Sequence, residues 1–321
     1  MALLLRHACD EFLIHCRVAK NLSPHTLRAY AIDLEEFQRF SGVEKPVDAI
    51  DRTHLRGFMK HLFDDRGLKE TSVKRRIACL KVLFRWLEQE DAVAITPFHR
   101  FDARIRLPQR LPRSLTRDEM RRLLDAATLR AALPVRNRYE TRALARCASR
   151  PGRHPALTTL TVLEVLYCTG MRVGELAAVR LPDLNMGEGI ITVNGKGNRQ
   201  RRVFLPEAGI IRLVGAYLDA RAQHSPGHDT LLTSPGGGPA TTQHLRSLVV
   251  GAGEAASLSR RITPHMLRHT AATHLLESGV DIRFVQRLLG HHSISTTEGY
   301  TQVSDTSLRD AIMGVRGGRR G

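Results

Sequence analysis

Apolar and polar positions in the first ninety residues predict four helices. HACDEFLIHCRVAK has helical apolar spacing, and SPHTLRAYAIDLEEFQRF opens with Ser23 as N-cap and Pro24 at the first helical position. DRTHLRGFMKHLFDDRG ends at a glycine, a common helix stop. The fourth stretch, KETSVKRRIACLKVLFRWLEQE, has an apolar stripe and a basic flank. We therefore expect a small helical bundle with a basic face over residues 1–92.

Between residues 93 and 114 the periodic pattern is lost and prolines interrupt the chain, as is typical of a linker between domains. The neighbourhood is strongly basic. Residues 100–153 hold 15 Arg against 5 acidic residues, a surplus of 10 positive charges out of the chain's 17. A linker that crosses a DNA backbone would need this charge, whereas a solvated spacer would merely tolerate it. We expect a basic linker at 93–114.

A second, mainly helical domain is predicted for residues 115–321. The expected helices begin near 116 and 241, directly after Gly170 and after Ser293, and span 157–170, 209–222, 263–279 and 281–290. Between them IITVNGKGNRQRRVFLP alternates like two strands around a Gly-Lys-Gly turn. The arginine-rich stretch 129–157 is expected to be a partly helical insertion of no assigned role. The fold class is thus mainly α, a helical bundle plus an α-rich domain with a small antiparallel β-sheet.

Charge points to the class of partner. The net charge of +17 and a sequence pI near 10.6 favour a polyanion, and nucleic acid is the first hypothesis. The count of 42 Arg against 7 Lys leaves GC-rich coding open as an ordinary explanation. Five cysteines without a CxxC pair argue against a zinc finger and a disulfide framework. No apolar run approaches the ~18 residues of a membrane span, so we expect a cytoplasmic protein that joins the nucleoid when bound to DNA.

The basic flank of the fourth helix supplies the candidates for DNA contact. Its members are Lys74, Arg75, Arg76, Lys81 and Arg85. Taken alone, such a flank is equally well explained as a solvated helix surface.

Two arginines lie where an anion would be held. His265 and Arg268 are three residues apart in the first turn of a predicted helix, where the helix dipole and free N–H groups favour a phosphate. Arg172 follows the break at Gly170, and Glu175 lies one turn later, able to hold its guanidinium. An arginine fixed in this way can clamp a phosphate through two hydrogen bonds.

Three further residues complete the candidate site. Lys196 is the only lysine after residue 81 and lies in the predicted hairpin turn. Lysine, unlike arginine, can release a proton when its surroundings lower its pKa, which suits a general acid. His291 follows a helix stop, and Tyr300 lies on the next predicted helix. Each residue alone fits a surface or packing role, but their order on separate elements favours convergence on one anion.

Three stretches, TGMRVGELAAVRLPDLN, ITVNGKGNRQRRVFLP and TPHMLRHTAATHLLESGVDIRFVQRLLGHHSISTTEGYTQV, make the second domain resemble the catalytic domain of the tyrosine recombinases. This is the phage integrase family, and the spacing is similar to that of its Xer-like site-specific recombinases. The first domain, with SPHTLRAYAIDLEEF, resembles the family's SAM-like core-DNA-binding domain. The resemblance therefore covers nearly the whole chain, although the arginine-rich stretch departs from the simplest Xer-like members.

The resemblance implies that DNA is cut and rejoined without a metal, a nucleotide or another cofactor. Tyr300 would attack the scissile phosphate to give a 3′-phosphotyrosine, while Arg172 and Arg268 would hold the non-bridging oxygens. Lys196 would protonate the leaving 5′-oxygen. His265 would take part in proton transfer, and His291 would hydrogen-bond the phosphate. Glu175 would be the carboxylate that supports Arg172.

The resemblance also implies partners. Two monomers would engage each duplex recombination site and four would form the synaptic complex, with exchange through a Holliday junction. The tail at 304–321 would dock on a neighbouring protomer. A second recombinase or an accessory DNA-bending protein remains open, as does the choice between integration, excision and resolution of a mobile element or replicon.

Three alternative functions fit part of this pattern. A metal-dependent hydrolase would use His265 and His269, but the pattern lacks the glutamate of HExxH, and Arg268 between the two would repel a cation. A non-catalytic DNA-binding factor of the same fold is opposed by the intact polar set. A type IB topoisomerase shares the chemistry, but the spacing of the stretches favours a recombinase.

Overall fold

A computed structural model of the chain describes residues 3–101, 105, 114–150, 152, 154–195, 200–223 and 227–290. The chain divides into two compact units, Met1–Arg110 and Leu111–Gly321, called the first and second unit below. The division falls within the stretch predicted as a linker.

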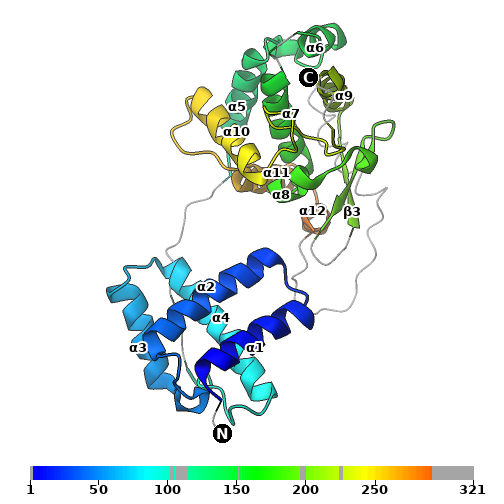
Figure 1. The fold of residues 1–321 in the computed structure, drawn as a ribbon. Helices are drawn as coiled ribbons and strands as arrows, with labels where there is room; N and C mark the ends of the chain where they lie inside the picture. Colours follow the sequence, from blue (N-terminus) through cyan, green and yellow to red (C-terminus); the bar gives the residue numbers. More distant parts are fainter. Residues whose placement is uncertain are drawn as a thin grey trace. The chain divides into compact units, whose positions relative to one another are not determined.

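Residues 3–101 of the first unit form four α-helices, as predicted: α1 (Leu5–Val18), α2 (Pro24–Ser41), α3 (Arg52–Asp64) and α4 (Glu70–Gln89) (Figure 1). A short 3-10 turn, Val47–Ala49, precedes α3. The predicted start of α2 is confirmed, because the Ser23 side chain accepts a hydrogen bond from the backbone N–H of Thr26. The apolar faces meet in one core built around aromatic rings such as Phe12, Phe37, Phe58 and Phe84.

The chain after α4 does not leave this core at once. Val93 and Phe101 are buried in it, and Phe98 packs against it. The first nine residues of the predicted linker therefore belong to the first unit. Burying their apolar side chains is favourable, because it removes apolar surface from water.

The second unit is built mainly from helices. In chain order they are α5 (Arg117–Arg130), α6 (Thr141–Ala148), α7 (His154–Thr169), α8 (Val173–Ala178), α9 (Ala208–Gln223), α10 (Thr242–Ala255), α11 (Pro264–Glu277) and α12 (Ile282–Leu289). Single 3-10 turns lie at Val135–Asn137 and Leu181–Asp183. Thr116 and Glu119 form a reciprocal capping box at the start of α5.

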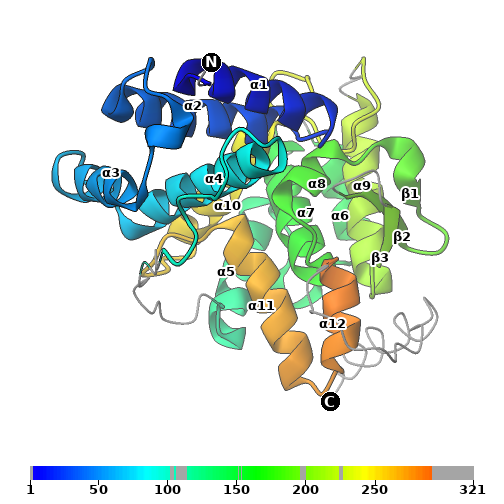
Figure 2. The same cartoon turned by 90° about the horizontal axis from the view of Figure 1, so that it is seen from below.

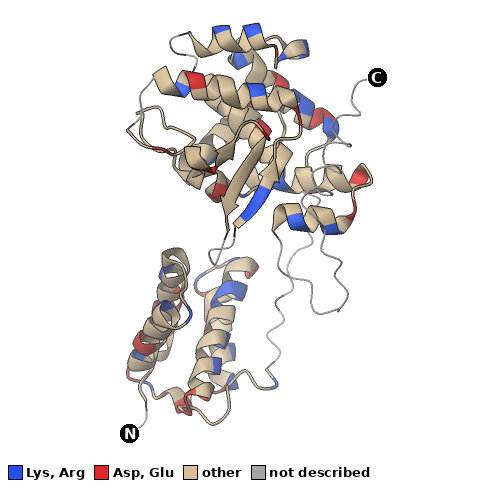
Figure 3. Ribbon diagram, turned by 90° about the vertical axis from the view of Figure 1, so that its right-hand side faces the viewer, with Lys and Arg blue, Asp and Glu red and all other residues tan. Residues whose placement is uncertain are grey.

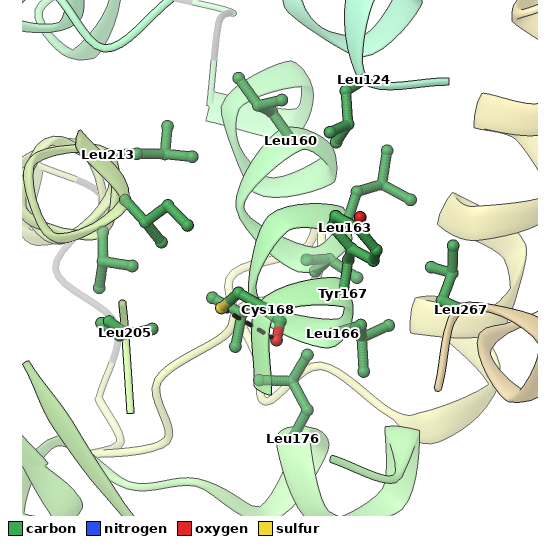
Figure 4. Packing of buried hydrophobic residues seen from close by; sticks show 14 of the residues in the cluster. Leu124, Leu160, Leu163, Leu166, Tyr167, Cys168, Leu176, Leu205, Leu213 and Leu267 are labelled. Carbon is green, nitrogen blue, oxygen red and sulfur yellow. Dashed lines mark hydrogen bonds between the residues drawn. The ribbon is translucent and has the colours of Figure 1, made fainter. Parts of the chain in front are cut away.

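Helix α7 is the centre of the second unit. It contacts α5, α9, α10 and α11, and all of its residues from Leu160 to Thr169 are buried. Figure 4 shows Leu163, Leu166 and Tyr167 of this helix packed among leucines from its neighbours. A helix apolar on all sides must be covered on all sides, so the C-terminus of α7 is held firmly within the unit.

A small antiparallel sheet, β1-β2-β3, flanks these helices; its strands are Leu184–Asn185, Ile190–Asn194 and Gln200–Phe204. The predicted hairpin is confirmed as β2 and β3, with Val193 opposite Arg201 and Ile191 opposite Val203. The short strand β1 was not predicted, because two residues carry no readable alternation. The turn at 196–199 lies outside the described residues.

Two further findings concern the described residues only. No helix among them is both long enough and apolar enough to cross a membrane. All five cysteines are buried, and none of them forms a disulfide.

Candidate active site

The site is built where α7 ends. Gly170 terminates the helix with a positive φ of 62°, and a Cβ at this position would lie 2.9 Å from Cδ2 of Leu289. The backbone conformation therefore favours glycine, and a larger residue here would also push against Leu289 of α12. The turn places Arg172 as the N-cap residue of α8.

Arg268 reaches the same turn from α11. Its side chain is only 5 % exposed, and it donates hydrogen bonds to the carbonyl oxygens of Gly170 and Leu289, each at 2.6 Å. Burial lowers the pKa of Arg268 to about 10, and the nearby Arg172 and Arg201 add repulsion. The guanidinium is thus still charged at neutral pH but lies among like charges, an arrangement that favours an incoming anion.

Glu175 binds two arginines. It accepts hydrogen bonds from the backbone N–H of Arg172 at 2.7 Å and from Nη1 of Arg172 at 2.9 Å, which confirms the predicted ion pair. Nη1 and Nη2 of Arg201 donate to its two oxygens at 3.0 and 2.8 Å. Burial alone would raise the pKa of Glu175, but these hydrogen bonds outweigh burial and lower it to about 2.

Sequence reasoning missed Arg201. Its position on β3 opposite the buried Val193, and two residues before the buried Val203, places it on the inner face of the hairpin. An arginine on the inner face of a strand needs a carboxylate partner, and this alternation is the signal that could have identified it.

The histidines of α11 divide into different environments. His265 and His269 are exposed, whereas His274 is buried. His274 bonds through Nε2 to the carbonyl of Leu115 and through Nδ1 to the hydroxyl of Tyr167. His269 thus lies at the surface, and His274 packs inside the unit.

The remaining candidates, Lys196, His291 and Tyr300, lie outside the described residues. In the sequence, Lys196 comes between β2 and β3, and His291 directly follows Gly290, the C-cap of α12. Helices α11 and α12 lie side by side (Figure 2). Within the described part of the chain, no three His, Cys, Asp or Glu residues come together as metal ligands.

The structure distinguishes among the five basic candidates of α4. Lys74 and Arg85 are exposed, and Lys81 lies 5.7 Å from the ring centroid of Phe98. Arg75 and Arg76, in contrast, both approach the carboxylate of the buried Asp33 on α2. Lys and Arg are spread over the ribbons of both units (Figure 3).

Sequence comparison covers both units. Residues 9–91 match the Phage integrase N-terminal SAM-like domain, and residues 113–307 match the Phage integrase family. Tyrosine recombinase XerC of Listeria innocua is 33 % identical over 308 residues, covering 94 % of this chain and 95 % of the relative. Tyrosine recombinase XerD of Oceanobacillus iheyensis is 30 % identical over 313 residues, covering 96 % and 97 %.

Solved structures share the fold. A lambda integrase dimer bound to a COC′ core site matches with a TM-score of 0.63 at 19 % identity, covering 94 % of this chain and 100 % of that chain. XerH recombinase bound to difH substrate in a pre-cleavage complex matches with a TM-score of 0.63 at 23 % identity, covering 94 % and 83 %. With both domain matches in chain order and relatives aligned almost end to end, the chain belongs to the phage integrase family, the tyrosine recombinases.

Proposed function

We propose that this protein is a site-specific recombinase that cuts and rejoins duplex DNA through a covalent bond between Tyr300 and a phosphate. The observation that carries the proposal is the convergence of Arg172 and Arg268 at the end of α7. Their guanidinium groups repel each other and are held by groups that do not neutralise both, namely one carboxylate and two carbonyl oxygens. A phosphate between them relieves this repulsion.

The side chains of Arg172 and Arg268 differ in how firmly they are held. Arg268 is fixed by its two carbonyl partners, which use two of the five N–H donors of its guanidinium. Arg172 is about half exposed and is held by Glu175 on one side. The pair would bind the two non-bridging oxygens and stabilise the charge that develops in the pentacoordinate transition state.

The proposed reaction exchanges one phosphate ester for another. The Tyr300 oxygen attacks phosphorus, the bond to the 5′-oxygen breaks, and Lys196 gives that oxygen a proton. His265 takes part in proton transfer with Tyr300, and His291 hydrogen-bonds the phosphate. The resulting 3′-phosphotyrosine conserves the ester bond, so a 5′-hydroxyl from a partner strand can reverse the step without nucleotide hydrolysis.

The partner proposed is duplex DNA carrying a recombination site. The net charge of +17 supports it, and so do relatives of this fold bound to DNA, including a lambda integrase tetramer on a Holliday junction. We propose that four copies assemble on two synapsed sites and exchange strands through a Holliday junction. The exchange would integrate, excise or resolve a mobile element or replicon, alone or with a second recombinase or an accessory DNA-bending protein.

The test is covalent trapping. DNA from the ends of the host element is nicked near the scissile phosphate so that the cleaved 5′ fragment diffuses away, and a chelator is present. An SDS-resistant protein–DNA adduct is expected with the wild type and is expected to be absent with Tyr300→Phe. DNA binding without an adduct on any end sequence would instead support a non-catalytic DNA-binding factor of the same fold.

A further inference from the structure

We propose that Arg201, on β3, is a positioning residue that keeps the guanidinium of Arg172 turned towards the scissile phosphate by occupying the carboxylate of Glu175. The proposal rests on the proposed function of the same site. Arg201 would not touch the DNA itself, but would act through Glu175 and through the end of α12.

The geometry of Arg201 is that of a fixed group. Its Nη1 and Nη2 donate in parallel to the two oxygens of Glu175, at 3.0 and 2.8 Å. Its Nε donates to the carbonyl oxygen of Leu288 at 3.3 Å. All three nitrogens are therefore engaged, and the side chain is only 16 % exposed. A bidentate arginine–carboxylate pair of this kind fixes orientation as well as charge.

Because Arg201 occupies both carboxylate oxygens of Glu175, fewer hydrogen bonds to Glu175 are left for the Arg172 side chain. Oε1 accepts from Nη1 of both arginines, while Oε2 accepts from Nη2 of Arg201 and from the backbone N–H of Arg172. The Arg172 side chain is left with one bond to Glu175, and its other nitrogens are in no hydrogen bond among the described residues. Without Arg201, both carboxylate oxygens can pair with the Arg172 guanidinium, which would draw it down onto α8 and away from a substrate phosphate.

Arg201 also links the elements that lead to the other residues of the proposed site. The last carbonyls of α12 are both held by site arginines, Leu288 by Arg201 and Leu289 by Arg268. Cationic groups stabilise a helix C-terminus. A Cβ at Gly290 would contact the Arg201 side chain at 3.4 Å. Arg201 therefore connects three elements: the strand that follows Lys196 in the sequence, the helix that carries Glu175, and the helix that precedes His291 in the sequence.

The experiment compares Arg201→Gln and Arg201→Lys with Arg202→Gln. Arg202 is the adjacent residue on β3 and is exposed, so its change removes the same charge from the same strand without touching Glu175. Single-turnover cleavage of nicked DNA is measured at saturating DNA. Arg201→Gln is expected to be roughly 10- to 100-fold slower, since a small misplacement of a catalytic group costs this much. Arg201→Lys should recover part of the rate, and Arg202→Gln should stay within about twofold of wild type.

A double-mutant cycle separates action through Glu175 from a general effect on folding. If Arg201 acts through Glu175, Glu175→Gln combined with Arg201→Gln should be only slightly slower than Glu175→Gln alone. Losses that simply multiply would overturn the proposal, as would equal losses in Arg201→Gln and Arg202→Gln. Arg201→Lys keeps the charge and provides the comparison if Arg201→Gln does not fold.

A second measurement needs no cleavage. Inorganic phosphate is expected to raise the melting temperature of the wild type above that in chloride at equal ionic strength. Arg172→Gln and Arg201→Gln should lose most of this rise, and Arg202→Gln should keep it. Equal phosphate stabilisation in Arg201→Gln and Arg202→Gln would contradict the role of Arg201. Failure of the wild type to form a Tyr300 adduct would reject the proposed function, while the phosphate result would still decide the role of Arg201.

Discussion

Both units contain a buried carboxylate placed between two arginines, Asp33 in the first unit and Glu175 in the second, and these two clusters are closely matched in exposure. Glu175 of the second unit is 9 % exposed, and Asp33 of the first is 1 % exposed. Each has a nearly buried arginine partner, Arg201 at 16 % and Arg76 at 11 % exposed. The other partner is about half exposed in both clusters; these residues are Arg172 and Arg75.

The clusters nevertheless differ in how well the charge is satisfied. Glu175 accepts four hydrogen bonds from its arginines, and its pKa falls to about 2. Asp33 accepts one from Arg75, whereas Nε of Arg76 stays 3.8 Å from Oδ1, which has no hydrogen-bond partner among the described residues. Burial therefore outweighs the Arg75 charge and raises the pKa of Asp33. Hydrogen-bond geometry, more than the number of charges, decides whether a buried carboxylate stays ionised.

The largest expected effect is on cleavage. Arg172→Gln removes a donor aimed at the developing phosphate charge, and such a loss typically slows the chemical step by roughly 10²- to 10³-fold. Arg180→Gln is the matched control, because Arg180 caps the next short helix in the same way, with its backbone N–H bonded to Asp183. Single-turnover cleavage at saturating DNA measures both. If both variants lost the same fraction of the cleavage rate, the Glu175 cluster would have no specific role in the chemical step.

Next in size is an effect on stability. Glu175→Gln leaves two arginines without their carboxylate, and we expect the free energy of unfolding to fall on the order of 3 kcal/mol. Asp33→Asn removes a charge that burial already disfavours, so the loss there should be below about 1 kcal/mol. Urea unfolding of the full chain, followed by circular dichroism, compares the two. Equal losses would mean that both carboxylates stabilise their units alike.

We expect pH to have a smaller effect on the free energy of unfolding, with opposite signs for the two carboxylates. The folded pKa of Glu175 is depressed from 4.5 to about 2, so its contribution to stability is present above pH 4.5 and is lost as pH falls; between pH 5 and pH 3 the loss is about 2 kcal/mol. The folded pKa of Asp33 is raised, so its contribution to stability grows as pH falls. Glu175→Gln should therefore flatten the acid decline in stability, and Asp33→Asn should steepen it. Urea unfolding at pH 5, 4 and 3 measures these slopes, and changes of the same sign would refute the contrast.

The two clusters also show which features of the structure can be predicted from the sequence and which cannot. The Arg172–Glu175 pair was predictable, because residues three apart on a helix are neighbours and a glycine break preceded them. The helices were predictable from caps such as Ser23 and Thr116. The burial of residues 93–101 in the first unit depends on long-range packing of apolar side chains, which local periodicity does not encode.

The partners of Arg268 and Asp33 could not have been predicted. Arg268 binds two backbone carbonyls, and every residue type provides a carbonyl, so no sequence signal distinguishes Gly170 or Leu289 as the acceptor. Asp33 and Arg75 are 42 positions apart on different helices, and their contact follows from how α2 packs on α4. Periodicity placed Arg75 on the basic flank, but only the packing shows that its charge is already engaged.

The smallest expected effect is on DNA affinity, and it depends on which basic side chains of α4 already have an ion-pair partner. Lys74 and Arg85 are exposed and form no ion pair among the described residues, so each is available to a phosphate. Lys74→Gln or Arg85→Gln should weaken binding about fivefold at low salt and reduce the slope of log affinity against log salt by about 1. Arg75→Gln should weaken binding less, because Asp33 already holds that guanidinium. Titrations of a duplex site at several salt concentrations compare the three variants. If Arg75→Gln has the largest effect, the DNA must draw Arg75 away from Asp33, and the first-unit cluster would then belong to the binding surface.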